Sequence, residues 1–311
     1  MKNTSYFLWI LLAAFIGFMG LTSGESPAST EGSSTDLPFL GSCKKVIIKA
    51  DDFCSINHPG GGWIADKVDP KFVRFSEIIK ARHIKASIGV IAKGLDSQPM
   101  AQQWIKEQKA TGLFEFWLHA WDHCSWTGPD GVVYNESSIP YELQMEHMRA
   151  AQAMSIEKLG GPFVTYSPPG TPGKILPAGA LMGANLRNAL RADPFIKVVM
   201  YPGSVDVDSA QMQSEGKITI LNRIPCGFLD IENPIFVPNF TIFQTKLAAA
   251  RKNYPQREYF WMQGHPWHWT DHDFEEFEKI LDFLTTDGVV FTTPFEYAEE
   301  LRRSGHRPYG Y

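Results

Sequence analysis

The chain has 311 residues, of which 44% are hydrophobic and 20% are charged. This composition supports a large buried core and excludes global disorder. The formal net charge of -5, without any run of Lys or Arg, argues against nucleic acid as a partner, and no feature of the sequence indicates an obligate protein partner.

The N-terminal residues resemble a targeting segment. Lys2 precedes an apolar stretch at 6–21, which is short for a membrane span and is followed by small residues. We therefore predict a secretory signal peptide at 1–24, a flexible Ser/Thr-rich linker at 25–39 and one folded domain at 40–311. The expected location is secreted, either extracellular or periplasmic. An uncleaved N-terminal membrane anchor is the alternative.

Apolar runs alternate with helix-like stretches along the folded domain. The predicted strands are 45–50, 85–92, 114–119, 162–167, 196–201, 218–221, 258–263 and 289–292. The predicted helices are 71–83, 98–111, 138–159, 178–191, 241–253 and 271–286. Such alternation predicts an α/β fold with a parallel sheet, and the number of strands favours a closed or nearly closed barrel over an open doubly wound sheet. Catalytic side chains of a barrel gather at the C-terminal ends of its strands.

Two adjacent carboxylates, Asp51 and Asp52, stand at the end of the first predicted strand. Neighbouring side chains at a strand end point in different directions. One carboxylate could therefore bind a metal ion while the other stays free as a base. The alternative is a loop aspartate that caps the next turn.

Two histidines, His119 and His123, stand four residues apart at the end of another predicted strand. They can converge on one ion if the backbone between them makes a helical turn. Asp52 is the natural third ligand, which would leave a coordination position for water. Two unrelated surface histidines are the alternative.

A third histidine, His265, follows the predicted strand 258–263 and has aromatic neighbours. It could act as a general acid. The alternatives are a histidine that only hydrogen-bonds a loop, or His268 in the same role.

The four cysteines contain no CxxC spacing, so a thiolate zinc site is not expected. Export would permit disulfides. Cys54 and Cys124 each lie close in sequence to a candidate metal ligand, so they could be near enough to form a disulfide if those ligands share one ion. Unpaired buried thiols are the alternative.

The order of these motifs resembles the polysaccharide deacetylase family, which is the NodB-homology domain of carbohydrate esterase family 4. The resemblance spans residues 44–300, and its most specific part is the stretch 119–123, HAWDH, which is close to the family pattern H-[S/T]-x-x-H. It implies a NodB-like, distorted (β/α) barrel with about seven parallel strands. It also implies that 40–311 is a polysaccharide deacetylase-like catalytic domain.

The resemblance also implies a role for each motif. Asp52, His119 and His123 would hold the metal, usually zinc, although another divalent metal is an alternative. Asp51 would be the general base and His265 the general acid. The paired aspartates match the family, whereas Phe53 stands where Gly is more common.

Two stretches depart from the family pattern. In 166–170, Ser167 replaces the arginine that holds the catalytic aspartate in the family. The backbone N–H of Gly170 could still serve an oxyanion, because glycine keeps the donor that proline lacks. The stretch 205–208 supplies aspartates but lacks the family's Trp, so Asp206 either orients a partner or caps a turn.

The predicted function is a secreted metal-dependent deacetylase that removes acetyl groups from a carbohydrate. Metal-activated water would attack the acetyl carbonyl, with Asp51 as base. A general acid matters most for an amine leaving group, so His265 favours N-acetyl groups of a polysaccharide. Trp121 and Trp267 are expected to stack on sugar rings, with packing at the barrel rim as the alternative.

Two other functions stay open at this level. Loss of the supporting arginine at Ser167 is compatible with a non-catalytic homologue that only binds glycan. A metal amidohydrolase that acts on a small amide would use the same ligands. An open groove would favour a polymer, whereas a closed pocket would favour a small amide.

Overall fold

The structure is a computed structural model in which all described residues belong to one compact unit, Leu40–Tyr311. The described residues are 43–53, 67–123, 125–127, 131, 133–169, 182–201, 207–223 and 229–305. The predicted signal peptide (1–24), the linker (25–39), Cys54, Cys124, Gly170 and Asp206 lie outside the described residues. No helix of the described part is long and apolar enough to cross a membrane.

All eight predicted strands are present, and they pair in parallel. They are β1 (Lys45–Phe53), β2 (Ala86–Ile91), β3 (Phe114–Ala120), β6 (Thr165–Tyr166), β7 (Val198–Tyr201), β8 (Thr219–Asn222), β9 (Tyr259–Gly264) and β10 (Val290–Phe291). The order runs β9-β1-β2-β3-β6-β7-β8, and the short β10 pairs with the start of β1. A separate antiparallel hairpin, β4 (Ser125–Thr127) and β5 (Val133–Asn135), was not predicted.

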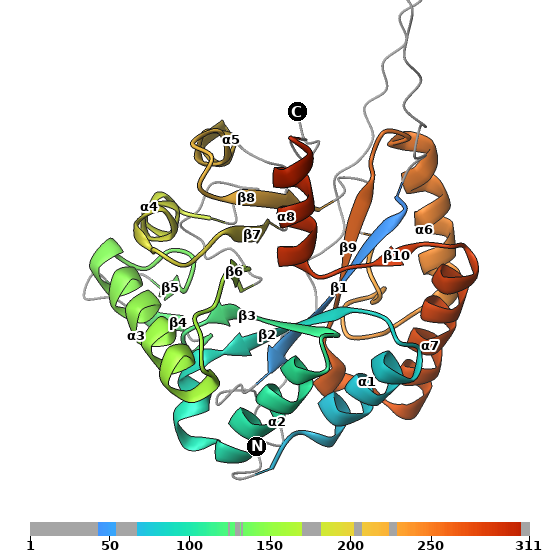
Figure 1. Cartoon of the computed structure of the whole chain (residues 1–311), viewed down its shortest axis with the longest axis horizontal. Coiled ribbons are helices and arrows are strands. Elements are labelled where there is room, and N and C mark those ends of the chain that lie inside the picture. Colours follow the sequence, from blue (N-terminus) through green and yellow to red (C-terminus); the bar gives the residue numbers. More distant parts are fainter. Residues whose placement is uncertain are drawn as a thin grey trace, which may run out of the picture. The chain divides into compact units, whose positions relative to one another are not determined.

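The seven main strands curl into a half-barrel, which confirms the predicted α/β, distorted barrel (Figure 1). Side chains of β9 reach across to β8, the other end of the curled sheet. The indole Nε1 of Trp261 donates to the carbonyl of Leu221 at 3.0 Å, and the hydroxyl of Tyr259 lies 3.2 Å from the carbonyl of Asn222. Within the described residues these side-chain bonds, rather than a backbone ladder, join the two ends of the sheet.

The six predicted helices are present, and two further α-helices and two short 3-10 helices were not predicted. The helices are α1 (Pro70–Ala81), η1 (Ala92–Ser97), α2 (Pro99–Ala110), α3 (Tyr141–Leu159), α4 (Ala184–Ala192), α5 (Val207–Ser214), α6 (Phe240–Asn253), η2 (Pro266–His268), α7 (Asp271–Thr286) and α8 (Pro294–Ser304). Local chemistry sets several starts. Thr270 and Thr293 each open a capping box, which satisfies backbone N–H groups of the first turn of α7 and α8.

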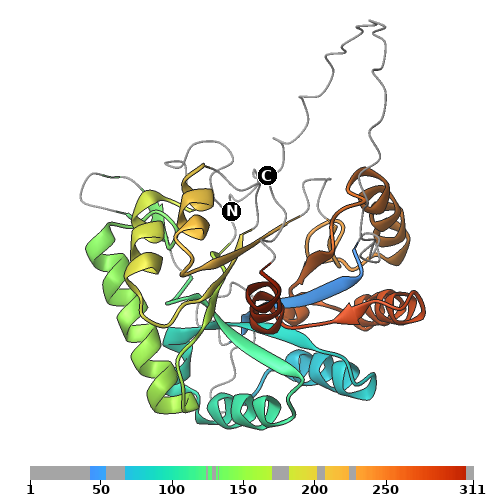
Figure 2. The ribbon, with the colours of Figure 1, turned by 45° about the horizontal axis from the view of Figure 1, so that its top comes forward.

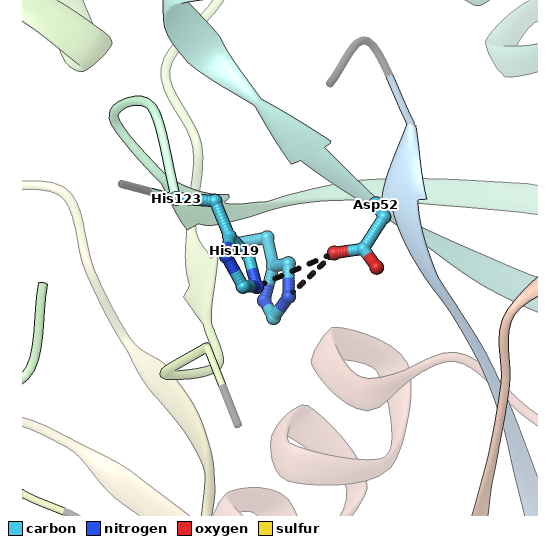
Figure 3. A group of neighbouring side chains, drawn as sticks. All are labelled: Asp52, His119 and His123. Carbon is cyan, nitrogen blue, oxygen red and sulfur yellow. Dashed lines mark ion pairs between the residues drawn. The ribbon is translucent and has the colours of Figure 1, made fainter. Parts of the chain in front are cut away.

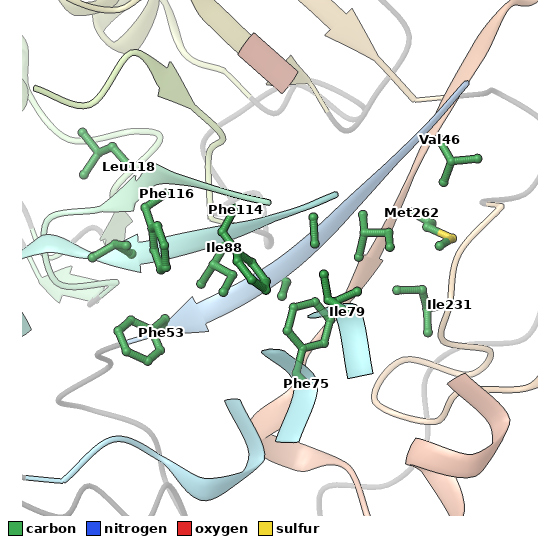
Figure 4. Close-up of a cluster of buried hydrophobic side chains, with 14 of the residues drawn as sticks. Val46, Phe53, Phe75, Ile79, Ile88, Phe114, Phe116, Leu118, Ile231 and Met262 are labelled. Atoms are coloured by element: carbon green, nitrogen blue, oxygen red, sulfur yellow. The ribbon is translucent and has the colours of Figure 1, made fainter. Parts of the chain in front are cut away.

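The outer apolar layer lies between the convex face of the sheet and the helices around it. In β1 this layer takes every second side chain, such as Val46 and Ile48, because successive strand residues point to opposite faces. Figure 4 shows part of the layer, where Phe75 and Ile79 of α1 face side chains of the sheet. Burial of this layer is the main source of the fold's stability.

The inner apolar layer lies inside the curve of the sheet. It joins Ile47 of β1, Trp117 of β3 and Trp261 of β9 to Tyr297 and Leu301 of α8. Figure 2 shows α8, in dark red, seen nearly end-on within the curve of the strands. Because α8 contacts the strands near their N-terminal ends, the opposite, C-terminal ends are left for polar side chains.

Candidate metal centre and catalytic site

Polar side chains gather where β1, β3 and β9 end. Alternation along β1 carries Lys49 and Asp51 to the inner face, below which Ile47 packs. Two backbone positions at these strand ends have a positive φ, which is 68° at Asp52 of β1 and 55° at His123 after β3. Residues other than glycine seldom adopt this left-handed region, and such conformations concentrate at functional sites.

Asp52, His119 and His123 lie together, and one potential ligand atom from each falls within 4.8 Å of the others. The Nε2 atom of His119 is 3.2 Å from Oδ1 of Asp52, and that of His123 is 3.5 Å from the same oxygen. Figure 3 shows both imidazole rings directed at the carboxylate. The three residues that the sequence motifs indicated thus come together in the fold, from the end of β1 and from the end of β3 with the residues after it.

These three side chains fit a divalent metal ion. Two imidazole nitrogens and one carboxylate oxygen form a donor set that leaves an open coordination position. The Nδ1 atom of His119 is 3.0 Å from the carbonyl oxygen of Ser167. A carbonyl only accepts, so Nδ1 carries the proton and the lone pair of Nε2 is directed at the site.

The other two candidate ligands, Asp52 and His123, also have an orientation or a protonation state that suits metal binding. The indole Nε1 of Trp267 donates to Oδ2 of Asp52 at 3.3 Å, which orients the carboxylate so that Oδ1 faces the histidines. Partial burial, together with the neighbouring His119, lowers the pKa of His123 below its usual value. A lowered pKa favours the neutral imidazole, which is the form that binds metal.

Asp51 lies beside the metal group and contacts a buried lysine that sequence analysis missed. Its side chain is 1% exposed, and that of Lys49, which contacts Oδ2, is 2% exposed. Oδ2 is also 3.9 Å from Nε2 of His119, whereas Oδ1 accepts no hydrogen bond from the described residues. Asp51 is therefore a fixed carboxylate with one oxygen available to take a proton.

Lys49 occupies an aromatic cage. Its Nζ lies 4.8 Å from the ring centre of Trp117 and 5.7 Å from that of Trp261. Burial lowers the pKa of Lys49, and the adjacent charge of Asp51 acts against this fall. The guanidinium of Arg223 lies 4.9 Å from the ring centre of Trp261, and burial lowers its pKa to about 10, so it stays protonated at neutral pH. Two cations thus accompany Asp51 where the arginine expected at position 167 is missing.

His265 is held by Glu232, a second residue that sequence analysis missed. Nδ1 of His265 is 2.8 Å from Oε2 of Glu232, and the backbone N–H of His265 donates to Oε1 at 2.6 Å. Burial lowers the pKa of His265, but the hydrogen bond and charge of Glu232 outweigh burial and raise this pKa above its usual value. The raised pKa favours the doubly protonated ring, in which Nε2 also carries a proton. Nε2 lies 3.2 Å from the side-chain amide of Gln263.

The residues predicted to bind the sugar, Trp121 and Trp267, differ in their contacts. Trp267 contacts Asp52, as described above, whereas Trp121 packs against the outer core and its ring centre is 6.0 Å from that of His147. His268 stacks on Phe236 at 4.1 Å between ring centres. Gly170, the predicted oxyanion donor, lies outside the described residues.

Comparison with known proteins finds similarity in fold but none in sequence. No family model matches the chain, and no curated protein matches it significantly. Puue allantoinase superposes with a TM-score of 0.58 at 11% identity, over 88% of this chain and 96% of that one. A Mycobacterium smegmatis protein, provisionally assigned as a polysaccharide deacetylase, gives 0.56 at 15% identity, over 90% and 96%.

A family 4 acetyl xylan esterase from Clostridium thermocellum, solved with a cobalt ion, gives a TM-score of 0.48 at 14% identity, over 85% of this chain and 93% of that one. The stronger matches confirm the fold that the motifs predicted, which is the fold of the polysaccharide deacetylases. At such low identities the likeness concerns the fold alone.

Proposed function

We propose that this protein is a metal-dependent hydrolase that removes acetyl groups from a carbohydrate, with N-acetyl groups of a polysaccharide as the first choice. The observation that carries the proposal is the convergence of Asp52, His119 and His123 beside the buried Asp51. A divalent ion, which we expect to be zinc, would supply a Lewis acid that polarises the acetyl carbonyl and makes water more acidic there.

The chain's own residues would perform the proton transfers. Asp51 takes a proton from the attacking water through its available Oδ1. Lys49 holds the other oxygen in place, which fixes the direction of the acceptor. His265, charged through its contact with Glu232, gives a proton to the leaving nitrogen or oxygen. The acetyl group leaves as acetic acid, which ionises to acetate, and the sugar is left with a free amine or hydroxyl. Asp51 is then protonated and His265 neutral, and loss of one proton from Asp51 to solvent and uptake of one by His265 restore the starting state.

The replacement of arginine by Ser167 need not abolish this chemistry. The positive charge that accompanies the base comes here from Lys49, with Arg223 nearby. Ser167 instead contributes its carbonyl to His119. This arrangement favours an enzyme over a homologue that only binds glycan.

Release of acetate from a panel of acetylated glycans, with and without added zinc, tests the proposal. Asp51→Asn keeps the shape but removes the proton acceptor, so the rate should fall by about 10²–10⁴-fold while metal content stays constant. Asp271→Asn, an exposed carboxylate that pairs with Arg74, is the matched control and should leave the rate unchanged. Loss of metal from Asp51→Asn would instead mean that the two aspartates have exchanged roles.

Hydrolysis of a small amide is the second candidate, favoured by the likeness to Puue allantoinase. The same metal group and the same two proton carriers would serve it. Allantoin in the same assay separates the candidates. Turnover of allantoin without acetate release from any glycan would replace the first proposal by the second.

We also propose export, because the apolar stretch at 6–21 is followed by small residues. Export would bring the enzyme to extracellular or periplasmic glycans. N-terminal sequencing of the mature protein tests this. A mature chain that begins at Met1 would favour an anchor instead.

A further inference from the structure

The two histidines of the metal group belong to one turn, and the backbone of this turn places His123 (Figure 3). His119 lies within β3 and its side chain is 2% exposed, whereas His123 follows the strand and its side chain is 38% exposed. The carbonyl of Ser167 orients the ring of His119. Because His123 lies nearer the surface, its position depends more on the backbone between the two histidines.

Trp121, midway between the two histidines, is held by a hydrogen bond at each of its backbone polar groups. Its carbonyl accepts from the backbone N–H of Lys93 of η1 at 2.8 Å. Its own N–H donates to Oε1 of Glu136, the residue after β5, at 3.3 Å. The neighbouring Ala120 has no polar side-chain atom that could take part. Two segments that are distant in sequence therefore fix the middle of the turn.

Glu136 is itself fixed inside the protein. The residue is 2% exposed, although it carries a carboxylate. Its Oε2 lies 3.3 Å from Nδ1 of His147, a buried residue of α3. Burial of a carboxylate is costly unless its oxygens have hydrogen-bond partners, and each oxygen of Glu136 has one. Glu136 thus connects α3 to the turn that carries two of the candidate metal ligands.

The place of this contact matters for metal binding. Trp121 is two residues from each histidine, so a shift of its backbone would change the distance between the two rings. Both Nε2 atoms now lie near Oδ1 of Asp52, at 3.2 Å and 3.5 Å. Bonds from zinc to histidine nitrogen measure about 2.0–2.1 Å, so the ion tolerates little displacement of a ligand.

We propose that Glu136 is a positioning residue of the metal centre: it accepts the backbone N–H of Trp121 and so keeps His123 in place beside His119 and Asp52. This inference rests on the proposed function for the presence of the metal ion, but it concerns metal binding and not turnover. Groups behind the ligands typically change metal affinity by about 10–100-fold when they are replaced.

The zinc affinity of the metal-free, full-length protein, measured by competition with a chelating dye, tests the inference. Glu136→Met keeps nearly the same length without a carboxylate, and it should bind zinc about tenfold or more weakly. Glu136→Gln keeps an oxygen that can accept the N–H of Trp121, and it should restore most of the affinity. The visible absorption of bound cobalt(II) depends on the arrangement of its ligands, so it should change in Glu136→Met and stay nearly the same in Glu136→Gln.

Glu115→Met is the matched control. Glu115 also accepts a backbone N–H, that of Phe295 at 2.8 Å, but it stands at the start of β3, whereas His119 stands near the end of this strand. Each change to Met leaves a backbone N–H without its acceptor, so both variants should lose stability in urea unfolding of the metal-free protein. Only Glu136→Met should also lose zinc affinity. If it does not fold, Glu136→Asp keeps the charge on a shorter side chain that no longer reaches Trp121, and it should weaken zinc binding as well.

The outcomes separate this inference from the proposed function. Equal zinc affinity in Glu136→Met and Glu115→Met would overturn the inference and leave Glu136 with a role in the fold alone. Failure of Glu136→Gln to recover the affinity would contradict it too. If the unchanged protein binds neither zinc nor cobalt, the inference falls together with the metal centre. Zinc binding that depends on Glu136, without acetate release from any glycan, would support the inference and count against deacetylation alone.

Discussion

Replacement of Lys49 by Met tests whether this lysine holds Asp51. Both side chains are almost fully buried, and the change leaves the carboxylate of Asp51 without its contacting cation. Removal of one partner from a buried ion pair typically costs about 3–5 kcal/mol. The loss should lie toward the lower end of this range, because the positive charge of Arg223 stays near Asp51.

The assay is urea unfolding of the full-length protein, followed by tryptophan fluorescence. Lys45→Met is the matched control, because Lys45 belongs to the same strand but pairs with the exposed Glu300. Such surface pairs contribute about 0–1 kcal/mol. The double variant Lys49→Met/Asp51→Asn removes both buried charges and should recover much of the lost stability. It also supplies a folded protein if the single variant does not fold.

The reasoning is refuted if Lys49→Met loses no more stability than Lys45→Met. Arg223 alone would then balance the charge of Asp51. A double variant that is less stable than either single variant would contradict it as well, since no unpaired charge would explain the loss. If Lys49 does hold Asp51, Lys49→Met should lower kcat for acetate release and change KM less. The reason is that Lys49 orients the base and does not touch the sugar.

Three further predictions concern other parts of the site and the barrel. A general acid works while protonated, so the rate should fall as pH rises through the raised pKa of His265. Glu232→Gln removes the charge that raises this pKa, so the fall should occur at lower pH in a rate–pH profile. His119→Ala should remove most bound zinc, measured by elemental analysis, while far-UV circular dichroism stays nearly unchanged; full zinc occupancy would contradict the ligand assignment. Gly89→Ala should lower the free energy of unfolding by about 1–3 kcal/mol, because the added Cβ would overlap the ring of Trp117. An unchanged urea midpoint would show that the ring can move away.

The regular part of the fold could be predicted because buried parallel strands appear as apolar runs between amphipathic helices. The hairpin β4–β5 escaped prediction because its strands are only three residues long. The start of α8 did carry a signal, namely Thr293, Pro294 and Glu296, which together form a capping box with proline at the first helical position. Attention to caps as well as to apolar periodicity would have found this helix.

The metal group could be predicted because its members follow strand ends and share a recognisable spacing. Lys49 also had a local signal, since residues 49 and 51 of one strand face the same side. A single lysine within an apolar run is also typical of an ordinary strand, so the pattern by itself does not single it out. Glu232 and Arg223 had no comparable signal. They come from the end of β8 and the segment after it, and only the curl of the sheet brings them to His265 and to the base.

The pairing of β1 with β9 has a consequence for how the chain is made. Lys45 is the register partner of Tyr259, and Ala50 is that of Gly264. The edge of β1 that pairs with β9 therefore stays uncovered until most of the chain has been synthesised. Contacts between such distant residues form slowly, and an uncovered apolar strand edge invites association with other chains. A growing chain therefore exposes the run Val46–Ala50 during most of its synthesis. Aggregation during expression should accordingly depend on the apolar residues of this strand.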